Sequence, residues 1–76
     1  MFEKFKEILV EELSVNEEDI KLEAELVNDL GINSLELAEL AFICEERFDI
    51  VIDDNDIQKF TTVCDVVNYM AEKAVN

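Results

Sequence analysis

Apolar residues in this chain recur with the spacing of an α-helix, and this spacing limits the folds that are open to it. Two segments show the pattern clearly, with one apolar face formed by Phe2, Phe5, Leu9 and Leu13 and another by Val63, Val66, Val67, Met70 and Ala74. No stretch sustains the alternation of a half-buried β-strand, and the apolar run at 50–52 is too short to assign as one. The sequence therefore predicts an all-α protein.

Four helical segments can be placed along the 76 residues. The first two are predicted at about Phe2–Leu13 and from Ser34 to about Phe48. A brief third is predicted through about Lys59, capped by Asp53 or Asp54, and a fourth is capped by Thr61 or Thr62. With no proline, one glycine and no internal linker, residues 1–76 are expected to form a single domain, an antiparallel four-helix bundle with a short third helix. The long loop between the first two helices needs anchors, for which the candidates are Ile20, Leu22, Leu26, Val27 and Leu30. Residues 17–19 are expected to add a short helical turn.

The charge and composition of the chain exclude several classes of function. Twenty acidic and six basic side chains leave a formal net charge of −14, which repels nucleic acid and anionic lipid. The absence of histidine removes the most common general base and zinc ligand, and the sequence shows no other catalytic or metal-binding cluster. The longest apolar run has five residues, from Leu40 to Cys44, far below the length of a membrane span. We therefore expect a small, monomeric module that is not an enzyme, binds no metal and meets basic partner proteins.

Cys44 and Cys64 are too few for a disulfide framework and are not spaced as a C-x-x-C redox pair. Two interpretations are open: a disulfide or redox pair, or two small buried hydrophobic side chains in a reducing compartment. We favour the second interpretation, which places the protein in the cytoplasm.

The second helix has the clearest start. Asn33 is a favourable N-cap residue and Glu36 follows three residues later, which makes a box-like N-x-x-E arrangement. Ser34 is then the first helical residue, near the free N–H groups and the positive dipole end of the helix. With no histidine in the chain, Ser34 cannot be the nucleophile of a Ser-His-Asp triad. Its hydroxyl is either a solvent-facing group or a position suited to an attached phosphodiester.

The same helix carries two apolar arcs. The broader arc, expected in the core, holds Leu37, Leu40, Ile43, Cys44 and Phe48, with Ala41 at its edge. The narrower arc lies roughly opposite and holds Leu35, Ala38 and Phe42, with Glu39, Glu45 and Glu46 along its borders. One helix of a small bundle cannot readily bury both arcs, so we interpret the narrower one as an exposed strip that docks other proteins. The alternative is that Phe42 folds against a neighbouring helix or a bound apolar ligand.

The segment around Ser34 resembles a known family. Residues 29–37 read D-L-G-I-N-S-L-E-L, which is similar to the D-L-G-x-D-S-L segment of the acyl carrier proteins. The likeness continues through E-E-R-F at 45–48, the acidic run at 53–56 and F-T-T-V at 60–63, and it covers nearly the whole chain. The chain departs from the family pattern at Asn33, where aspartate is usual, and this removes one negative charge beside Ser34.

This resemblance implies a specific role. The serine matching Ser34 carries 4′-phosphopantetheine, which a phosphopantetheinyl transferase (holo-acyl-carrier-protein synthase) adds from coenzyme A. The thiol of that arm carries acyl intermediates as thioesters between enzymes of fatty-acid or related polyketide and lipid biosynthesis, and the acyl chain can lie in the core between helices two, three and four. The residues implied to dock on basic patches of those enzymes are Leu35, Glu36, Ala38, Glu39, Phe42, Glu45, Glu46, Asp54 and Asp56.

Two alternatives to this role remain at the level of sequence. One is a specialised carrier of aminoacyl or peptidyl groups, and the other is a helical interaction module that uses the exposed strip without an arm. The acidic run at 53–56 is also open to two interpretations, a weak cation site or the solvated start of the third helix. It lacks the glycine and glutamate of an EF-hand loop, so we favour the helix start.

Overall fold

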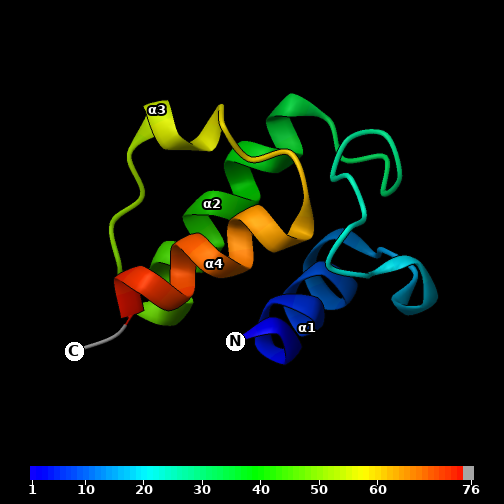
Figure 1. The fold of residues 1–76 in the computed structure, drawn as a ribbon, viewed down its shortest axis with the longest axis horizontal. Coiled ribbons are helices and arrows are strands. Elements are labelled where there is room, and N and C mark those ends of the chain that lie inside the picture. Colours follow the sequence, from blue (N-terminus) through cyan, green and yellow to red (C-terminus); the bar gives the residue numbers. More distant parts are fainter. Residues whose placement is uncertain (75–76) are drawn as a thin grey trace.

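The computed structural model describes residues 1–74, which fold into four α-helices (Figure 1). These are α1 (Phe2–Leu13), α2 (Ser34–Phe48), α3 (Asp54–Ile57) and α4 (Val63–Ala74), with a 3-10 helix, η1, at Glu17–Asp19. The described residues contain no strand, only an isolated bridge between Glu25 and Thr62. The predicted all-α class, the helices at 2–13 and 34–48 and the short turn at 17–19 are confirmed.

The third helix is shorter than expected and ends at Ile57 instead of Lys59. The N–H of Lys59 donates to the carbonyl of Asp56 at 3.0 Å, and that of Phe60 donates to the carbonyl of Ile57 at 3.2 Å. These bonds span three residues and not four, so the chain tightens into a 3-10-like turn where an α-helix would continue.

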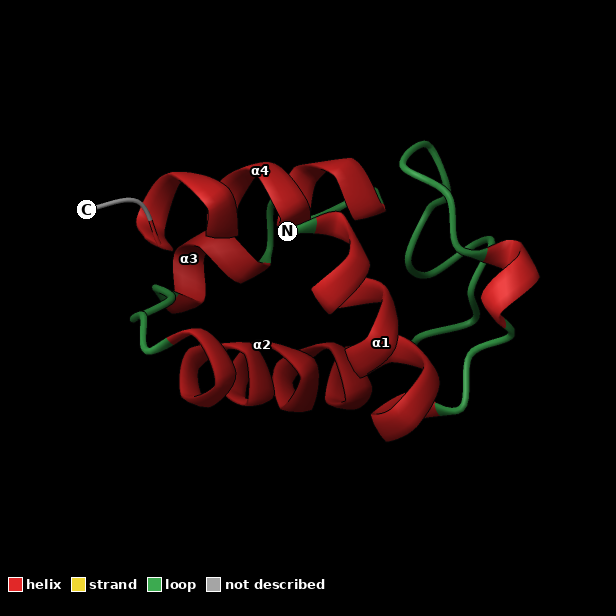
Figure 2. Cartoon of the chain, turned by 90° about the horizontal axis from the view of Figure 1, so that it is seen from below, coloured by secondary structure: helices red, strands yellow, loops and turns green. Residues whose placement is uncertain are grey.

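The helices do not all run antiparallel. α1 runs in one direction along the molecule, and α2 and α4 both run in the other (Figure 1, Figure 2). The connection at 49–62 is the reason, because it carries the chain back along α2, by way of α3, before α4 begins. The four helices expected from the sequence are therefore present, with α2 and α4 as a parallel pair.

One hydrophobic core lies between the three longer helices and the long loop. Of the apolar face predicted for α1, Phe5 and Leu9 are buried and Phe2 and Leu13 are half-buried, and the neighbouring Ile8 is buried as well. The face predicted for α4 is buried at Val63, Val66, Val67 and Met70. The side chain of Ala74, assigned to the same face, lies outside the described residues. In the predicted core arc of α2, Leu40 and Cys44 are buried, as is Ala41 at its edge, whereas Leu37, Ile43 and Phe48 are half-buried.

The long loop, which extends beside α1 in Figure 2, packs through a partly different set of anchors than expected. Ile20, Ala24, Leu26 and Ile32 are buried and Leu30 is half-buried, but Leu22 and Val27 are exposed. The register is set by bonds to the start of α4, where the N–H of Leu26 donates to the carbonyl of Thr61 at 2.9 Å and that of Val63 donates to the carbonyl of Ala24 at 3.0 Å. Ala24 and Leu26 flank Glu25, the residue of the isolated bridge, so both side chains face the core. Leu22 and Val27 lie in turns on either side of the bridge, where this alternation does not continue.

A reciprocal cap begins α4. The N–H of Asp65 donates to Thr62 Oγ1 at 3.2 Å, and Asp65 Oδ2 accepts the N–H groups of Thr62 at 3.0 Å and Thr61 at 3.1 Å. The backbone bonds from Thr62 and Thr61 lower the pKa of Asp65 below its ordinary value. The stabilisation they provide is therefore present above the ordinary carboxyl pKa and is lost as the pH falls through the lowered one.

Candidate functional site

The turn that leads into α2 places Ser34 at the surface. Gly31 has a φ of 69°, in the left-handed region, and its N–H donates at 3.1 Å to the carbonyl four residues earlier. Asp29 holds the other side of the turn, because its Oδ2 accepts the N–H of Glu25 at 2.8 Å. Ile32 then enters the core, where its side chain is 2% exposed. The D-L-G-I segment therefore has a structural role, because its turn leaves the first residues of α2 exposed to solvent.

The first turn of α2 has the predicted capping box. Asn33 Oδ1 accepts the N–H of Glu36 at 2.8 Å, and Glu36 Oε1 accepts the N–H of Asn33 at 3.1 Å. The N–H of Leu37 donates to the carbonyl of Asn33 at 2.9 Å. The N–H groups of Ser34 and Leu35, the first two of the helix, have no partner within the helix and lie beside the Ser34 hydroxyl. This positive helix end can stabilise a phosphodiester attached to that hydroxyl.

Removing the cap is expected to destabilise the fold by about 1 kcal/mol, within a range of roughly 0.5–2 kcal/mol. Asn33→Ala deletes the acceptor for the N–H of Glu36, and urea unfolding followed by circular dichroism measures the loss. Asn33→Asp is the matched control, because aspartate caps a helix about as well as asparagine, and its stability should stay within about 0.5 kcal/mol of the wild type. Equal losses in the two variants would contradict this role for Asn33.

An apolar strip on α2, formed by Leu35, Ala38 and Phe42, is exposed as predicted. Leu35 is 70% exposed and Phe42 is 60% exposed. Together with Glu39 and Ile43, the strip lines a shallow surface hollow of about 360 Å³. The exposure of Phe42 contradicts the alternative in which its ring folds against a neighbouring helix. Because docking is the role predicted for them from the sequence, we call Leu35, Ala38 and Phe42 the docking strip.

The acidic residues predicted for docking fall into two groups. Glu39, Glu46 and Asp54 are exposed. Glu36, Glu45 and Asp56 are half-buried, and each accepts a hydrogen bond within the fold. Glu36 completes the capping box, Glu45 Oε2 accepts the N–H of Ile52 at 2.8 Å, and Asp56 Oδ2 accepts the phenol of Tyr69 at 2.7 Å. A helical wheel could not reveal these bonds to Ile52 and Tyr69, because it shows the direction of a side chain and not its partners.

The two cysteines are free thiols, one buried and one half-buried. Burial raises the pKa of the Cys44 thiol to about 12, so that thiol stays protonated and behaves as a small hydrophobic side chain.

Asp53 Oδ1 accepts the N–H of Asn55 at 2.9 Å and caps α3, which supports the helix-start interpretation of the acidic run. Within residues 1–74, no group of three or more cysteine, aspartate or glutamate side chains is placed to hold a metal ion. None of the helices described is both long enough and apolar enough to cross a membrane.

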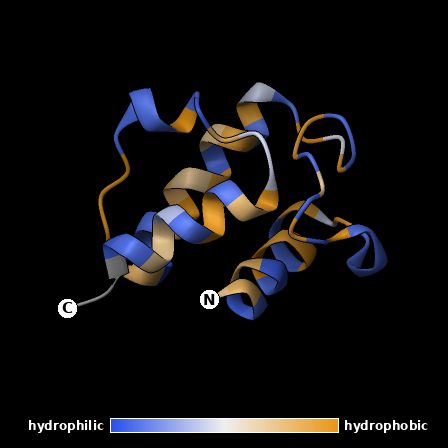
Figure 3. Ribbon diagram, in the orientation of Figure 1, coloured by the Kyte–Doolittle hydropathy of each residue, from blue (hydrophilic) through white to orange (hydrophobic). Residues whose placement is uncertain are grey.

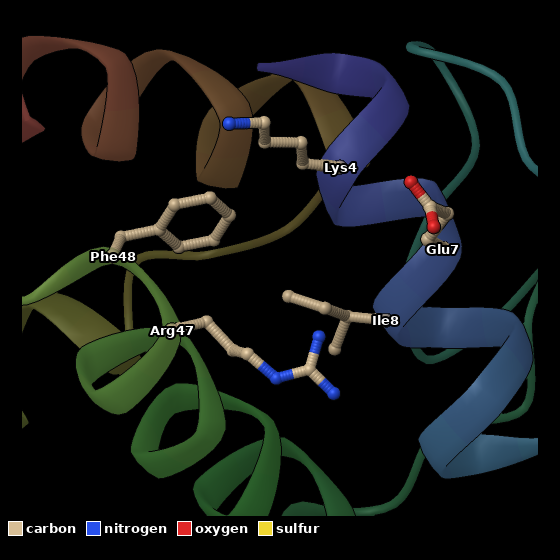
Figure 4. A pocket seen from close by; sticks show the side chains of 5 residues that line it. All are labelled: Lys4, Glu7, Ile8, Arg47 and Phe48. Atoms are coloured by element: carbon tan, nitrogen blue, oxygen red, sulfur yellow. The ribbon is translucent and has the colours of Figure 1, made fainter.

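A second hollow, of about 280 Å³, lies between α1 and the end of α2 (Figure 4). Ile8 and Phe48 lie between the side chains of Lys4 and Arg47. Arg47 already pairs with α1, since its Nη2 is 3.2 Å from a carboxylate oxygen of Glu12. Arg47 lies 13 positions after Ser34, a distance of about 20 Å along the helix, so this hollow lies apart from the candidate site.

The fold and the site together define a class of protein, a small, acidic, all-α domain with an exposed serine at a helix start and an exposed apolar strip beside it. A protein-family model described as a phosphopantetheine attachment site matches residues 3–70. The acyl carrier protein of Clostridium perfringens is 46% identical over 72 residues, which are 95% of this chain and 95% of that protein. The acyl carrier protein of Campylobacter lari is 43% identical over 70 residues, 92% of this chain and 91% of that protein. The crystal structure of the acyl carrier protein from Thermotoga maritima matches with a TM-score of 0.83 and 28% identity, over 93% of this chain and 82% of that one.

The chain therefore belongs to the acyl carrier proteins, the family that has a phosphopantetheine attachment site. It carries acyl groups on a covalently attached 4′-phosphopantetheine and is a carrier, not an enzyme. Members of the family interact with a phosphopantetheinyl transferase and with biosynthetic enzymes. The family predicted from residues 29–37 is confirmed, and the alternatives of an aminoacyl carrier or an arm-free module are not favoured.

Proposed function

We propose that Ser34 is the residue to which 4′-phosphopantetheine is attached in this chain. The observation that carries this proposal is the position of the Ser34 hydroxyl, which is exposed on the first residue of α2 at the end of the docking strip. The site fits the group, because the free N–H groups of Ser34 and Leu35 can hold a phosphodiester oxygen at the positive helix end. When bound, the arm supplies a thiol that holds acyl groups as thioesters.

The docking strip and its exposed carboxylates are the proposed contact surface for the transferase and for enzymes of fatty-acid or related biosynthesis. The strip supplies a small apolar area, and the exposed carboxylates of Glu39 and Glu46 lie on the same helix, each one turn from a residue of the strip. Asp54 adds an exposed carboxylate on α3. A basic patch on a partner is steered toward such a surface, which raises the association rate, while the small apolar area keeps the affinity modest. Fast association with modest affinity suits a carrier that visits several enzymes in turn.

The chain is proposed to act as a single domain and a monomer, in the cytoplasm. The continuous core supports the first of these, since residues of all three longer helices and the long loop belong to one buried cluster. The two free thiols are in keeping with a reducing compartment, where cysteines stay unpaired.

Incubation with coenzyme A and a broad-specificity phosphopantetheinyl transferase tests the attachment. The intact protein should gain the mass of one phosphopantetheine, and peptide mapping should place that gain on the segment that contains Ser34. A folded protein that gains no mass would argue against modification by this transferase, and Asn33→Asp then restores the family's usual charge beside Ser34. A gain on a peptide that lacks Ser34 would overturn the proposal.

Truncating the docking strip is expected to weaken partner binding without unfolding the protein. Phe42→Ala removes a ring that is 60% exposed, so stability should change by less than about 1 kcal/mol, whereas the apparent affinity for the transferase should fall about 5–30-fold. The measurement pairs a titration of the loading rate against protein concentration with a urea unfolding curve. Val10→Ala is the matched control, because Val10 is an exposed apolar residue on α1 outside the strip. A large loss of stability in Phe42→Ala would show that the ring belongs to the core.

A further inference from the structure

The sequence on both sides of Ser34 supplies no cation that could balance a phosphodiester. Residues 22–46 contain no lysine or arginine, and they contain seven carboxylates. The chain enters α2 through a hydrophilic stretch at the edge of the molecule (Figure 3). A phosphodiester on Ser34 therefore adds negative charge to a negative segment, and N–H groups at the helix start are the donors that this segment offers it.

Asn33 carries such a donor directly beside Ser34. The N–H of Glu36 donates to Asn33 Oδ1 at 2.8 Å, so the oxygen of this side-chain amide is the atom that caps the helix. The nitrogen of the same amide has two N–H bonds to donate. Within residues 1–74, Asn33 Nδ2 makes no hydrogen bond to the protein, and the residue is exposed. The donor is therefore open to a group attached to the next residue.

The other asparagines with described side-chain bonds differ from Asn33. Asn28 and Asn68 donate their Nδ2 groups to other side chains of the fold. Asn16 resembles Asn33 more closely, because it is exposed and its Oδ1 caps η1. The residue after Asn16 is Glu17, however, which cannot carry the arm. Asn33 therefore combines a cap with an open donor next to the attachment residue.

We propose that Asn33 is a positioning residue for the phosphodiester of the arm, an inference that rests on the proposed attachment at Ser34. Its Nδ2 donor adds to the free N–H groups of Ser34 and Leu35 at the helix start. Aspartate, which is usual in the family at this position, caps a helix about as well but supplies a second negative charge and no donor. By holding the phosphodiester, Asn33 fixes the point, beside the docking strip, from which the arm leaves the protein.

The stability of each variant with and without the arm tests this role, because a residue that only caps the helix affects both forms equally. Asn33→Gly caps almost as well as asparagine but has no amide, and Asn33→Asp keeps the cap and adds charge. On attachment, the equilibrium constant of unfolding should fall about tenfold in the wild type, about threefold in Asn33→Gly and less than twofold in Asn33→Asp. Urea unfolding at fixed ionic strength measures each pair. An equal effect of the arm in the wild type and in Asn33→Gly would overturn the inference.

The side-chain amide signals in the NMR spectrum give a second readout, which capping alone would not move. On attachment, the Nδ2 protons of Asn33 should shift downfield, because a charged acceptor makes a shorter and stronger hydrogen bond. Asn16 is the internal control, and its amide signals should stay in place. Unmoved signals of Asn33, or equal shifts at both asparagines, would overturn the inference.

A synthetic protein separates this inference from the attachment reaction. A chain of 76 residues is within reach of chemical synthesis, so phosphopantetheinyl-serine can be placed at position 34 without the transferase. Enzymatic attachment at another residue would contradict the proposed function. The synthetic protein would still decide the role of Asn33, by the same two measurements.

Discussion

Ser34→Ala is expected to abolish the gain of phosphopantetheine completely while leaving the fold intact. The hydroxyl is the only group that the substitution removes, and it lies exposed at the first residue of α2, outside the capping bonds made by Asn33 and Glu36. Alanine is a good helix former at this position, so the free energy of unfolding should change by less than about 0.5 kcal/mol. Intact-protein mass after treatment with coenzyme A and the transferase, together with a urea unfolding curve, measures both effects.

The chain offers a matched control, because its only other serine is Ser14. Ser14 ends α1 with a φ of 56°, in the left-handed region that glycine adopts without strain. Ser14→Gly therefore removes the second serine hydroxyl without a backbone penalty, and this variant should be loaded as well as the wild type. If Ser34→Ala still gains phosphopantetheine, the arm is attached at another residue and the assignment to Ser34 is wrong. Unfolding of Ser34→Ala would instead show that the serine has a structural role.

Phe5→Ala is expected to cost about 3–5 kcal/mol of stability, the largest loss that a single truncation should produce here. The ring of Phe5 is fully buried among residues of the one hydrophobic core. A domain of 76 residues has a total stability of roughly 4–11 kcal/mol, so this loss removes a large part of it. Urea unfolding at fixed ionic strength measures the change, since a charge of −14 makes stability depend on salt.

Phe42→Ala deletes the same atoms from an exposed ring and is the control for this experiment. The difference between the two losses reports burial alone, because the change in composition is identical. Similar losses in the two variants would contradict the assignment of Phe5 to the core and of Phe42 to the surface. The loss of stability in Phe48→Ala should lie between those of Phe5→Ala and Phe42→Ala, because the Phe48 ring is half-buried at the end of α2.

Most of the candidate site could be predicted from local sequence. Asn33 and Glu36 define a helix start by their spacing, Ser34 is then the first helical residue, and the docking strip follows from the angles of one helix. All of these features depend on residues fewer than ten positions apart, which is the range over which helical geometry fixes relative placement. The attachment of phosphopantetheine was predicted from the family resemblance of residues 29–37, because helical periodicity alone gives no information about it.

The contacts that several acidic side chains make within the fold could not be predicted in the same way. Glu45 accepts a bond from Ile52 across the end of α2, Asp56 accepts one from Tyr69 in another helix, and Arg47 reaches Glu12 over 35 positions. Each pair forms only after the helices have packed, and no periodic pattern connects its members. The structure thus divides the predicted docking carboxylates into exposed ones and ones that also hold the fold together.

Sequence by itself determined which segments are helical, where α2 begins and which of its faces stays exposed, because these properties follow from local hydrogen bonding and from the 3.6-residue period. Tertiary structure alone decided the parallel direction of α2 and α4 and the use of Ala24 and Ile32 as anchors in place of Leu22 and Val27. These features depend on how the loops return the chain and on which side chains fill the space between helices. The packing of the whole chain determines these features, so they cannot be predicted from any single segment.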